Sequence, residues 1–440
     1  MTPSRSCWST TDGLSDHIKV ETKDPDLYPK FTSQYTDQTV AANSVIVVCG
    51  DKSKVVSNSD MWETSTNYQT YQTQTTGFDG EGQITSAITY VTSENNPKVY
   101  WVTGHGEASE SDLSTNFSDA VNKNNVEISD LALMTDDIPE DAEELVIMSP
   151  TTDFSEDEAN KVITYLENGG KLLMFTSYTG TDMPNLDSIL ENYGVKRSSG
   201  IVVETDSQHY YPQMPYYLLP NIQSDDITTE VKSNYILMPV AQAIQKLDSY
   251  RDTITIKSLL TTTEDAYIEN DPENSTWSKS ADSETGAFDL GVSITETVDD
   301  KETQIIYFSS ASMLSSQIDQ AISGANSKLA ATALTSMCDV EQTVVIPSKS
   351  TSYTNLVFTQ GAVNTWSIIT IAGIPLVLVV IGVMIWMKRR NSDEEKGKMA
   401  ACLILLVLLL AVLVVLTKKN STADADSSSS DSGADAEKVV

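Results

Sequence analysis

Lys98-Val99-Tyr100-Trp101-Val102-Thr103-Gly104-His105-Gly106-Glu107 is the stretch that decides the fold of this 440-residue chain. Residues 99–102 are apolar or aromatic, which is typical of a buried strand, and the run then breaks at two glycines. A buried strand followed by a glycine turn is how many α/β domains begin. The strands and helices predicted after this stretch therefore determine whether the sheet is parallel or antiparallel.

Further strands and helices alternate after it. Strands are predicted at Val126–Leu133, Glu144–Met148 and Lys171–Phe175, and helices at Ser109–Asn122 and Asn185–Tyr193. Ser155 and Glu158 form the capping box of another helix, which Asn168-Gly169-Gly170 ends. Strands alternating with helices predict an α/β fold with a parallel, doubly wound sheet.

Ligands of such sheets usually bind at the carboxyl ends of the strands. Three loops lie there, Thr103–Glu107, Ser149–Asp153 and Thr176–Thr181. The candidate binding residues are Gly104, His105, Gly106, Glu107, Ser149 and Pro150. An alternative stays open, in which the two glycines only permit a tight turn that His105 caps.

A catalytic role is tested by the nucleophiles on offer. A hydrolase-like or amidotransferase-like domain needs a nucleophile at a sharp strand-to-helix turn and a histidine base. Ser177 lacks the flanking glycines of such a turn, the domain has no cysteine, and the only histidines are His17, His105 and His209. His105 with Ser177 is the one candidate pair, and we predict no catalytic residue.

The regions on either side of this domain have a mixed pattern. On the N-terminal side we expect a strand at Ile18–Val20, a hairpin at Ser44–Val56, a loop or exposed edge over residues 57–76 and a helix at Gly82–Val91. On the C-terminal side we expect strands at Gly200–Val203, Ile254–Ile256, Ser258–Leu260, Leu290–Thr297 and Thr303–Phe308, and a helix at Ala325–Met337.

Two polar or aromatic stretches interrupt the C-terminal half. His209–Tyr217 is predicted to be an aromatic loop, either a partner contact or tyrosines packed on the domain. Glu264–Gly286 is predicted to be an acidic surface excursion. Its carboxylates could attract calcium but do not match an EF-hand, so we favour a solvated acidic face and predict no metal; they are Glu264, Asp265, Glu269, Asp271 and Glu273.

Ile368–Met387 is an uncharged apolar run long enough to span a bilayer. Lys388-Arg389-Arg390 follow it, and Trp366 and Trp386 lie where interfacial aromatic residues belong. We predict a membrane anchor; a buried core helix is the alternative. Pro375 is tolerated within membrane helices.

A second apolar run, Met399–Leu416, predicts a second span. The cations between the two runs place the 388–398 loop in the cytoplasm and residues 1–365 outside it. The Ser/Asp-rich residues 420–440 predict a disordered tail. Because residues 1–20 contain no apolar targeting segment, we expect the start of the chain to be incomplete.

Composition excludes some partners. The chain carries 62 acidic and 28 basic side chains, a formal charge of −34, which would repel nucleic acid. The four cysteines show no metal-binding spacing, and Cys49 with Cys338 is the one candidate disulfide pair. No Walker A motif occurs, so an ATPase would be a separate subunit, and we predict no cofactor.

The order of these motifs resembles a known family. The run Val99–Glu107, the strand ending Met148-Ser149-Pro150, and Ser155–Glu158 before the helix that ends at Gly169-Gly170 are similar to the auxiliary, extracytoplasmic components of uncharacterised ABC-type transport systems, the family of the gliding-motility-associated auxiliary proteins. The resemblance spans roughly Val20 to Arg390. It implies a glutamine-amidotransferase-like (flavodoxin-like) fold without the nucleophile, working with an ABC ATPase and a permease on an unknown cargo.

The predicted organisation has six parts. They are an N-terminal α+β region (1–96), the α/β domain (97–225), a β-rich continuation (226–360), the anchor with its basic stop (366–390), the second transmembrane helix (399–417) and the tail (420–440). The alternatives to a non-catalytic transport subunit are a surface-anchored enzyme using His105 and Ser177, and a solute-binding receptor.

Overall fold

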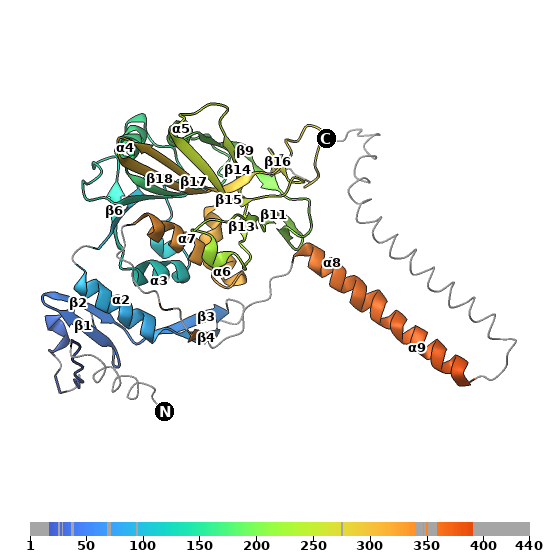
Figure 1. The fold of residues 1–440 in the computed structure, drawn as a ribbon, viewed down its shortest axis with the longest axis horizontal. Coiled ribbons are helices and arrows are strands. Elements are labelled where there is room, and N and C mark those ends of the chain that lie inside the picture. The colour runs from blue at the N-terminus through green and yellow to red at the C-terminus, as the bar shows by residue number, and fades with distance from the viewer. Residues whose placement is uncertain are drawn as a thin grey trace, which may run out of the picture.

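The computed structural model describes residues 17–24, 27–28, 30–36, 39–67, 72–93, 96–273, 276–338, 346, 349–350 and 359–389. The main body is built on an eleven-stranded sheet (Figure 1). Its strands are β5 (Lys98–Thr103), β6 (Glu127–Ala132), β7 (Glu144–Met148), β8 (Lys171–Phe175), β9 (Val195–Val203), β12 (Asn221–Ile222), β14 (Gln242–Lys246), β15 (Ile254–Thr261), β16 (Tyr267–Glu269), β17 (Asp289–Val298) and β18 (Lys301–Phe308). The sheet takes strands from both sides of residue 225, and the domain limits themselves stay a prediction.

The sheet is mixed: the predicted parallel order is confirmed for β5 to β8, but the sheet as a whole is not parallel. The path β6-β5-β7-β8-β18 is parallel, and the strands beyond it are antiparallel. β17 and β18 form a hairpin about Asp299 and Asp300, both at positive φ. Once β18 runs parallel to β8, its hairpin partner must run the opposite way, and β14 and β15 continue from it antiparallel.

Helices cover both faces of the parallel half (Figure 1). One face carries α3 (Thr115–Lys123), α6 (Ser316–Ala321) and α7 (Ala325–Met337), and the other carries α4 (Glu156–Glu167) and α5 (Pro184–Asn192). Val146 and Met148 of β7 pack into the first core, while Leu145 and Ile147 pack into the second. This alternation explains why residues 145–148 of the strand are all apolar.

Two predicted helices differ at their starts by two or more residues, and α5 begins one residue before its predicted start. The helix expected from Ser109 begins at Thr115, because Ser109 and Asp112 close a 3-10 turn of their own over Glu110–Asp112, and Ser114 then caps α3. The helix expected from Gly82 begins at Gly80 and is α2 (Gly80–Thr92). Further 3-10 turns are η1 (Thr32–Gln34), η3 (Thr229–Val231) and η4 (Ala311–Leu314).

A smaller unit forms around α2. The predicted hairpin is present as β1 (Val45–Cys49) and β2 (Lys52–Val56), and it packs with α2 around Val56, Met61 and Ala87. Residues 57–76 were expected to be a loop or an exposed edge; they contain β3 (Trp62–Asn67), which is an edge strand, and most of β4 (Gln72–Phe78). Threonine favours strands even where no apolar alternation exists, and this is the pattern here.

The small sheet is completed from the other end of the chain. β19 (Lys349–Ser350) pairs with β4, and Lys123 Nζ donates to the carbonyl oxygen of Ile346 at 2.9 Å. The chain therefore returns to the N-terminal unit before it enters its last helix. Residues Ile18–Val20, expected to be a strand, form none, and Ile18 is exposed.

Other corrections concern the β-rich half. The aromatic stretch 209–217 is not a loop but contains β10 (Tyr210–Tyr211) and most of β11 (Met214–Leu218), which form a hairpin that pairs further with β13 (Met238–Pro239). The acidic excursion 264–286 contains β16, which pairs with β9. The two strands expected between Ile254 and Leu260 are the single strand β15.

One apolar helix leaves the body (Figure 1). It consists of α8 (Gln360–Ile368), a π-helical segment (Ile369–Gly373) and α9 (Ile374–Arg389). The stretch Gln360–Trp386 is long and apolar enough to cross a membrane, and none of its most apolar window is buried in the body, which removes the alternative of a core helix. Pro375 lacks an N–H, and the hydrogen-bond pattern shifts just before it. The second predicted span and the tail lie outside the described residues.

The candidate disulfide does not form. Cys49 and Cys338 are both free cysteines. Cys338 is buried at the end of α7, where its Sγ donates to Glu144 Oε2 at 3.3 Å. Burial raises the pKa of the Cys338 thiol, so this cysteine is held as a neutral hydrogen-bond donor.

Candidate functional site

The three loops predicted to share one edge of the sheet do lie together. The backbone N–H groups of Thr151 and Thr152 donate to the carbonyl oxygen of His105 at 2.9 and 3.1 Å. Ser149 Oγ is 2.8 Å from Ser177 Oγ, which joins the second loop to the third. The parallel strands β5, β7 and β8 position these loops side by side.

Glycine is required where the first loop turns. Gly104 and Gly106 have φ values of +123° and +76°, a backbone region that L side chains rarely adopt. A Cβ at Gly106 would also overlap the hydroxyl of Thr151. Both glycines are exposed, so the loop presents bare backbone to the surroundings.

His105 lies inward, between two carboxylates. Its side chain is 5% exposed, with Nδ1 3.2 Å from Glu107 Oε1 and Nε2 3.3 Å from Glu158. The backbone N–H of His105 also donates to Glu107 Oε2 at 2.7 Å, and the ring packs on Phe154 with centroids 4.3 Å apart. His105 thus joins its own loop to the first turn of α4.

Glu158 has two roles, of which the sequence predicts one. Ser155 donates to Glu158 Oε2 from its backbone N–H at 2.8 Å and from its hydroxyl at 2.6 Å, which confirms the capping box. Burial acts to raise the pKa of Glu158, but the Ser155 hydrogen bonds and His105 outweigh it and lower the pKa. The contact with His105 was missed, because no local pattern links residues so far apart in sequence.

The arrangement does not assemble a catalytic pair. Both ring nitrogens of His105 face carboxylates, and no hydrogen bond joins His105 to Ser177 in the part of the chain that the structure describes. A general base needs a ring nitrogen directed at the nucleophile. The ring is placed to hold two segments together and not to accept a proton from Ser177.

Glu107, Ser149 and Pro150 complete the set of candidate binding residues. The Glu107 side chain is 2% exposed and Pro150 is buried, so neither presents much surface. Ser149 is partly buried and has a φ of +54°. The exposed part of the site is therefore backbone at Gly104 and Gly106, and a binding role for these six residues stays a prediction.

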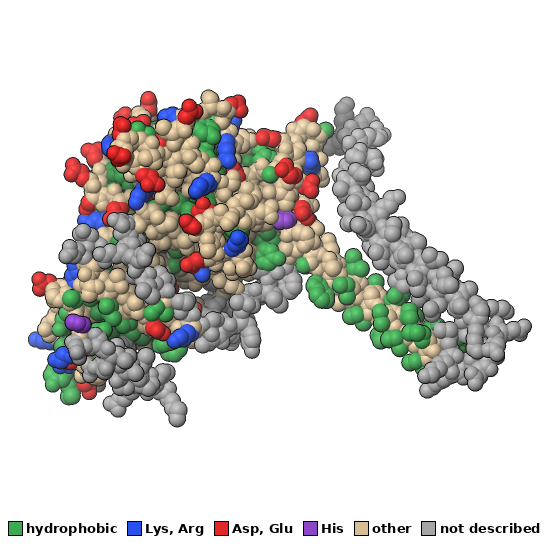
Figure 2. Space-filling model, viewed as in Figure 1, with side chains coloured by type: hydrophobic (Ala, Val, Ile, Leu, Met, Phe, Trp, Pro, Cys, Tyr) green, Lys and Arg blue, Asp and Glu red, His purple; other side chains and the backbone are tan. Residues whose placement is uncertain are grey.

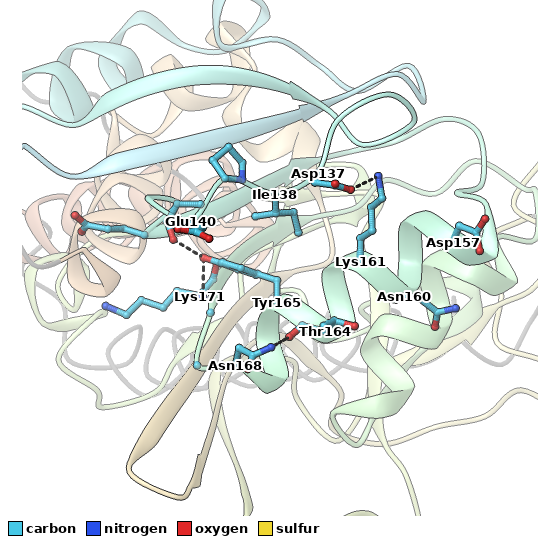
Figure 3. A pocket seen from close by; sticks show the side chains of 15 residues that line it. Asp137, Ile138, Glu140, Asp157, Asn160, Lys161, Thr164, Tyr165, Asn168 and Lys171 are labelled. Atoms are coloured by element: carbon cyan, nitrogen blue, oxygen red, sulfur yellow. Dashed lines mark hydrogen bonds and ion pairs between the residues drawn. The ribbon is translucent and has the colours of Figure 1, made fainter.

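A cavity of about 930 Å³ lies at the opposite end of the strands (Figure 3). It is bounded by α4 and by residues 137–143, at the amino ends of β7 and β8. Figure 3 shows Lys161 directed at Asp137, and its Nζ also donates to the carbonyl oxygens of Leu133 and Asp136. Within the described ranges no group of three acidic, histidine or cysteine side chains could hold a metal ion.

Solved structures give only distant likenesses. The "mmIFT52 N-terminal domain" aligns with a TM-score of 0.41 and 15% identity over 55% of this chain and 96% of that one. A ThuA-like protein from Parabacteroides merdae ATCC 43184 aligns at 0.31 and 12%, over 60% and 99%. The exo-beta-1,4-mannosidase Op5Man5 from Opitutaceae bacterium strain TAV5 aligns at 0.29 and 10%, over 57% and 37%. Scores this low do not establish a shared fold.

A comparison with curated proteins gave no match. A family model does match, over residues 96–336, which is more than half of the chain and holds the glycine turn, the capping box and the eleven-stranded sheet. Its description is "ABC-type uncharacterized transport system". The matched segment is narrower than the resemblance drawn from the motifs, since it leaves out the N-terminal unit and the last helix. This chain belongs to the family of auxiliary components of uncharacterised ABC-type transport systems.

Proposed function

We propose that this protein is a membrane-anchored, non-catalytic auxiliary subunit that works with a separate ABC ATPase and permease. The observation that carries the proposal is the family match over the body. The same chain continues into a helix long and apolar enough to cross a membrane. The family supplies the link to transport, and the helix supplies the means of staying beside a permease.

The buried histidine supports a role without catalysis. With Glu107 and Glu158 against its two ring nitrogens, His105 stabilises the loop and α4. We propose that the parallel half is an amidotransferase-like domain without a nucleophile, and that its carboxyl-end loops contact a partner. The exposed backbone of Gly104 and Gly106 would allow that partner to approach closely.

The charge pattern supports one orientation. Lys388, Arg389 and Arg390 follow the apolar run, and Lys396 and Lys398 come soon after. Cationic loops stay in the cytoplasm, so we propose that residues 1–365 are extracytoplasmic. The formal charge of the chain is −34, and so acidic a protein is suited to an aqueous compartment.

Co-purification tests the partners. The full-length chain, tagged and extracted in mild detergent, should bring down an ABC ATPase and a permease that mass spectrometry identifies. A control with an unrelated tagged protein carrying a single membrane helix measures background. Recovery of neither subunit above that background would contradict the proposal.

A further inference from the structure

The hairpin of β10 and β11 is joined directly to the start of the apolar helix. Gly361 N donates to the carbonyl oxygen of Ser207 at 2.6 Å, and Gln213 N donates to Gln360 Oε1 at 3.0 Å. Thr359 Oγ1 donates to Gln208 Oε1 at 3.1 Å. These contacts fix where the hairpin lies relative to the helix.

Gly361 makes this junction close. A Cβ added there would overlap the side-chain amide of Gln208, and Gly361 is the one residue of α8 that is buried. The helix and hairpin therefore touch backbone to side chain. The hydrogen bonds named above all involve residues 359–361, at the start of the helix, and they hold the helix and the hairpin together.

The distance from this junction to the apolar core of a bilayer is short. Eight residues separate Gln360 from Ile368, where the apolar run begins, which corresponds to about 12 Å of helix. The headgroup region on each side of a bilayer is roughly 5–8 Å thick. With the helix upright, Gln360 lies about 4–7 Å outside the headgroup region, a distance that the long side chains of a hairpin fixed there can reach.

The composition of the hairpin suits that position. Residues 210–224 contain no charged side chain, although the chain has 62 acidic residues, and residues 350–387 also contain none. Tyr210, Tyr211, Tyr216 and Tyr217 are partly exposed, and Met214 is 37% exposed. Tyrosine is enriched at membrane interfaces because its ring is apolar and its hydroxyl is polar.

The aromatic group extends beyond the hairpin. The ring of Tyr216 lies 4.4 Å from that of Trp277 and 5.4 Å from that of Tyr217, measured between centroids. Trp277 comes from the segment that was expected to be only an acidic excursion. Figure 2 shows hydrophobic side chains on the body where the apolar helix leaves it.

We propose that the hairpin Tyr210–Leu218 rests in the headgroup layer of the bilayer that the helix crosses, and so sets the orientation of the body on the membrane. The inference rests on the proposed anchoring. Tyr211 and Tyr217 also pack against the core of the body, so the aromatic stretch would serve both of the uses that the sequence leaves open. Its occupant is lipid, and a protein partner at this surface is the competing outcome.

A fluorescent label at residue 214 tests the contact. Cys7, Cys49 and Cys402 are replaced by serine, while buried Cys338 is kept because its thiol does not titrate near neutral pH. An environment-sensitive dye on Met214→Cys, in phosphatidylcholine nanodiscs, is expected to be blue-shifted and quenched several-fold more by a shallow spin-labelled lipid than the same dye on Met134→Cys, an exposed methionine after β6.

A third label distinguishes failure of the proposed membrane anchor from failure of the hairpin inference. A dye on Val377→Cys reports the anchor itself, since Val377 lies in α9 and is 54% exposed. If residue 377 is in lipid but residue 214 matches residue 134, the hairpin inference is wrong and the anchor stands. If residue 377 is in water, both fail. A change at residue 214 that needs added permease would overturn lipid as the occupant.

A variant of the junction supplies a second test. Gly361→Val should displace Gln208 and release the hairpin from the helix, so the quenching of the dye at residue 214 should fall toward the level at residue 134. Gly382→Val makes the same substitution at an exposed glycine of α9, where a Cβ meets no atom within 4 Å, and should leave the quenching unchanged. If the dye at residue 214 is quenched as strongly in Gly361→Val as in the control variant, the junction does not position the hairpin.

Discussion

His105 stabilises two segments that are distant in sequence. Its imidazole lies between Glu107, in its own loop, and Glu158, in the first turn of α4, and the three side chains are nearly excluded from water. A glycine-flanked histidine beside a carboxylate also predicts a ligand site. That His105 also contacts Glu158 follows only from the fold, because the two residues are distant in sequence.

Replacing Glu158 should separate its two roles. Glu158→Gln keeps an acceptor for the capping box but loses the charge facing His105, and should lower the free energy of unfolding by about 1 kcal/mol. Glu158→Ala loses both and should cost about 2–3 kcal/mol. Urea unfolding measures both values. Equal losses would show that the capping acceptor contributes nothing, and no loss in Glu158→Gln would show that the charge facing His105 contributes nothing.

The same carboxylate predicts an acid-dependent loss of stability. The pKa of Glu158 is lowered in the folded protein, so its contribution is present above the ordinary value of 4.5 and is lost as pH falls through the lower, folded value. As the pH is lowered below about 4.5, the thermal unfolding temperature should therefore fall more steeply for the wild type than for Glu158→Gln. Parallel curves would contradict this assignment.

Glu144 should behave in the opposite way. It is fully buried at the start of β7, and burial raises its pKa well above the usual range, although Cys338 and Lys171 oppose this. Its neutral form is favourable at low pH, and the contribution is lost as pH rises through the folded pKa.

Glutamine in place of Glu144 should remove that loss. Unfolding in urea at pH 6 and pH 9 should show the wild type weakening more with pH than Glu144→Gln does. Glu143→Gln, at the neighbouring and partly exposed position, should follow the wild type. If Glu144→Gln also follows the wild type, the buried carboxyl is not titrating in this range.

The helices and strands with the clearest apolar patterns are those whose bounds the sequence predicted best. β7, β8 and α7 begin and end at the predicted residues, because each is an apolar run or stripe bounded by turn residues. β3 and β4 carry threonine and glutamine with no alternation, so the sequence left a loop and an exposed edge as alternatives. Their pairing depends on partners distant in sequence, including β19.

Gly200 tests how an edge strand is attached. A Cβ at Gly200 would overlap the carbonyl oxygen of Glu269, the last residue of β16, so Gly200→Ala should separate β16 from β9. We expect a loss of about 1–3 kcal/mol in unfolding free energy and faster amide exchange in residues 267–269. Lys196→Ala, an exposed change on the same strand, is the control. Unchanged exchange would contradict the close approach.

At the scale of the molecule, the sequence predicted the parts better than their connections. The family and the apolar helix were recognisable from local runs of residues. The mixed sheet was not, because its antiparallel half depends on which side of β8 the β17–β18 hairpin adds. The three loops of the candidate site lie together at one edge of the strands, as predicted, while the inward-facing histidine was not foreseen.

Cys49 offers a test of the orientation of the whole chain. It is an exposed cysteine in the N-terminal unit. With Cys7 and Cys402 replaced by serine, a membrane-impermeant maleimide should label Cys49 in intact cells, and Cys49→Ser should abolish the signal. Labelling that appears only after the cells are broken would place the body in the cytoplasm.

The junction at Gln360 and Gly361 determines how the molecule would carry mechanical load. A permease that pulls on the apolar helix would transmit tension through Ser207, Gln208 and Gln213 straight into the strands of the large body. The N-terminal unit pairs with β19 and takes part in none of these contacts, so the large body would feel the pull first.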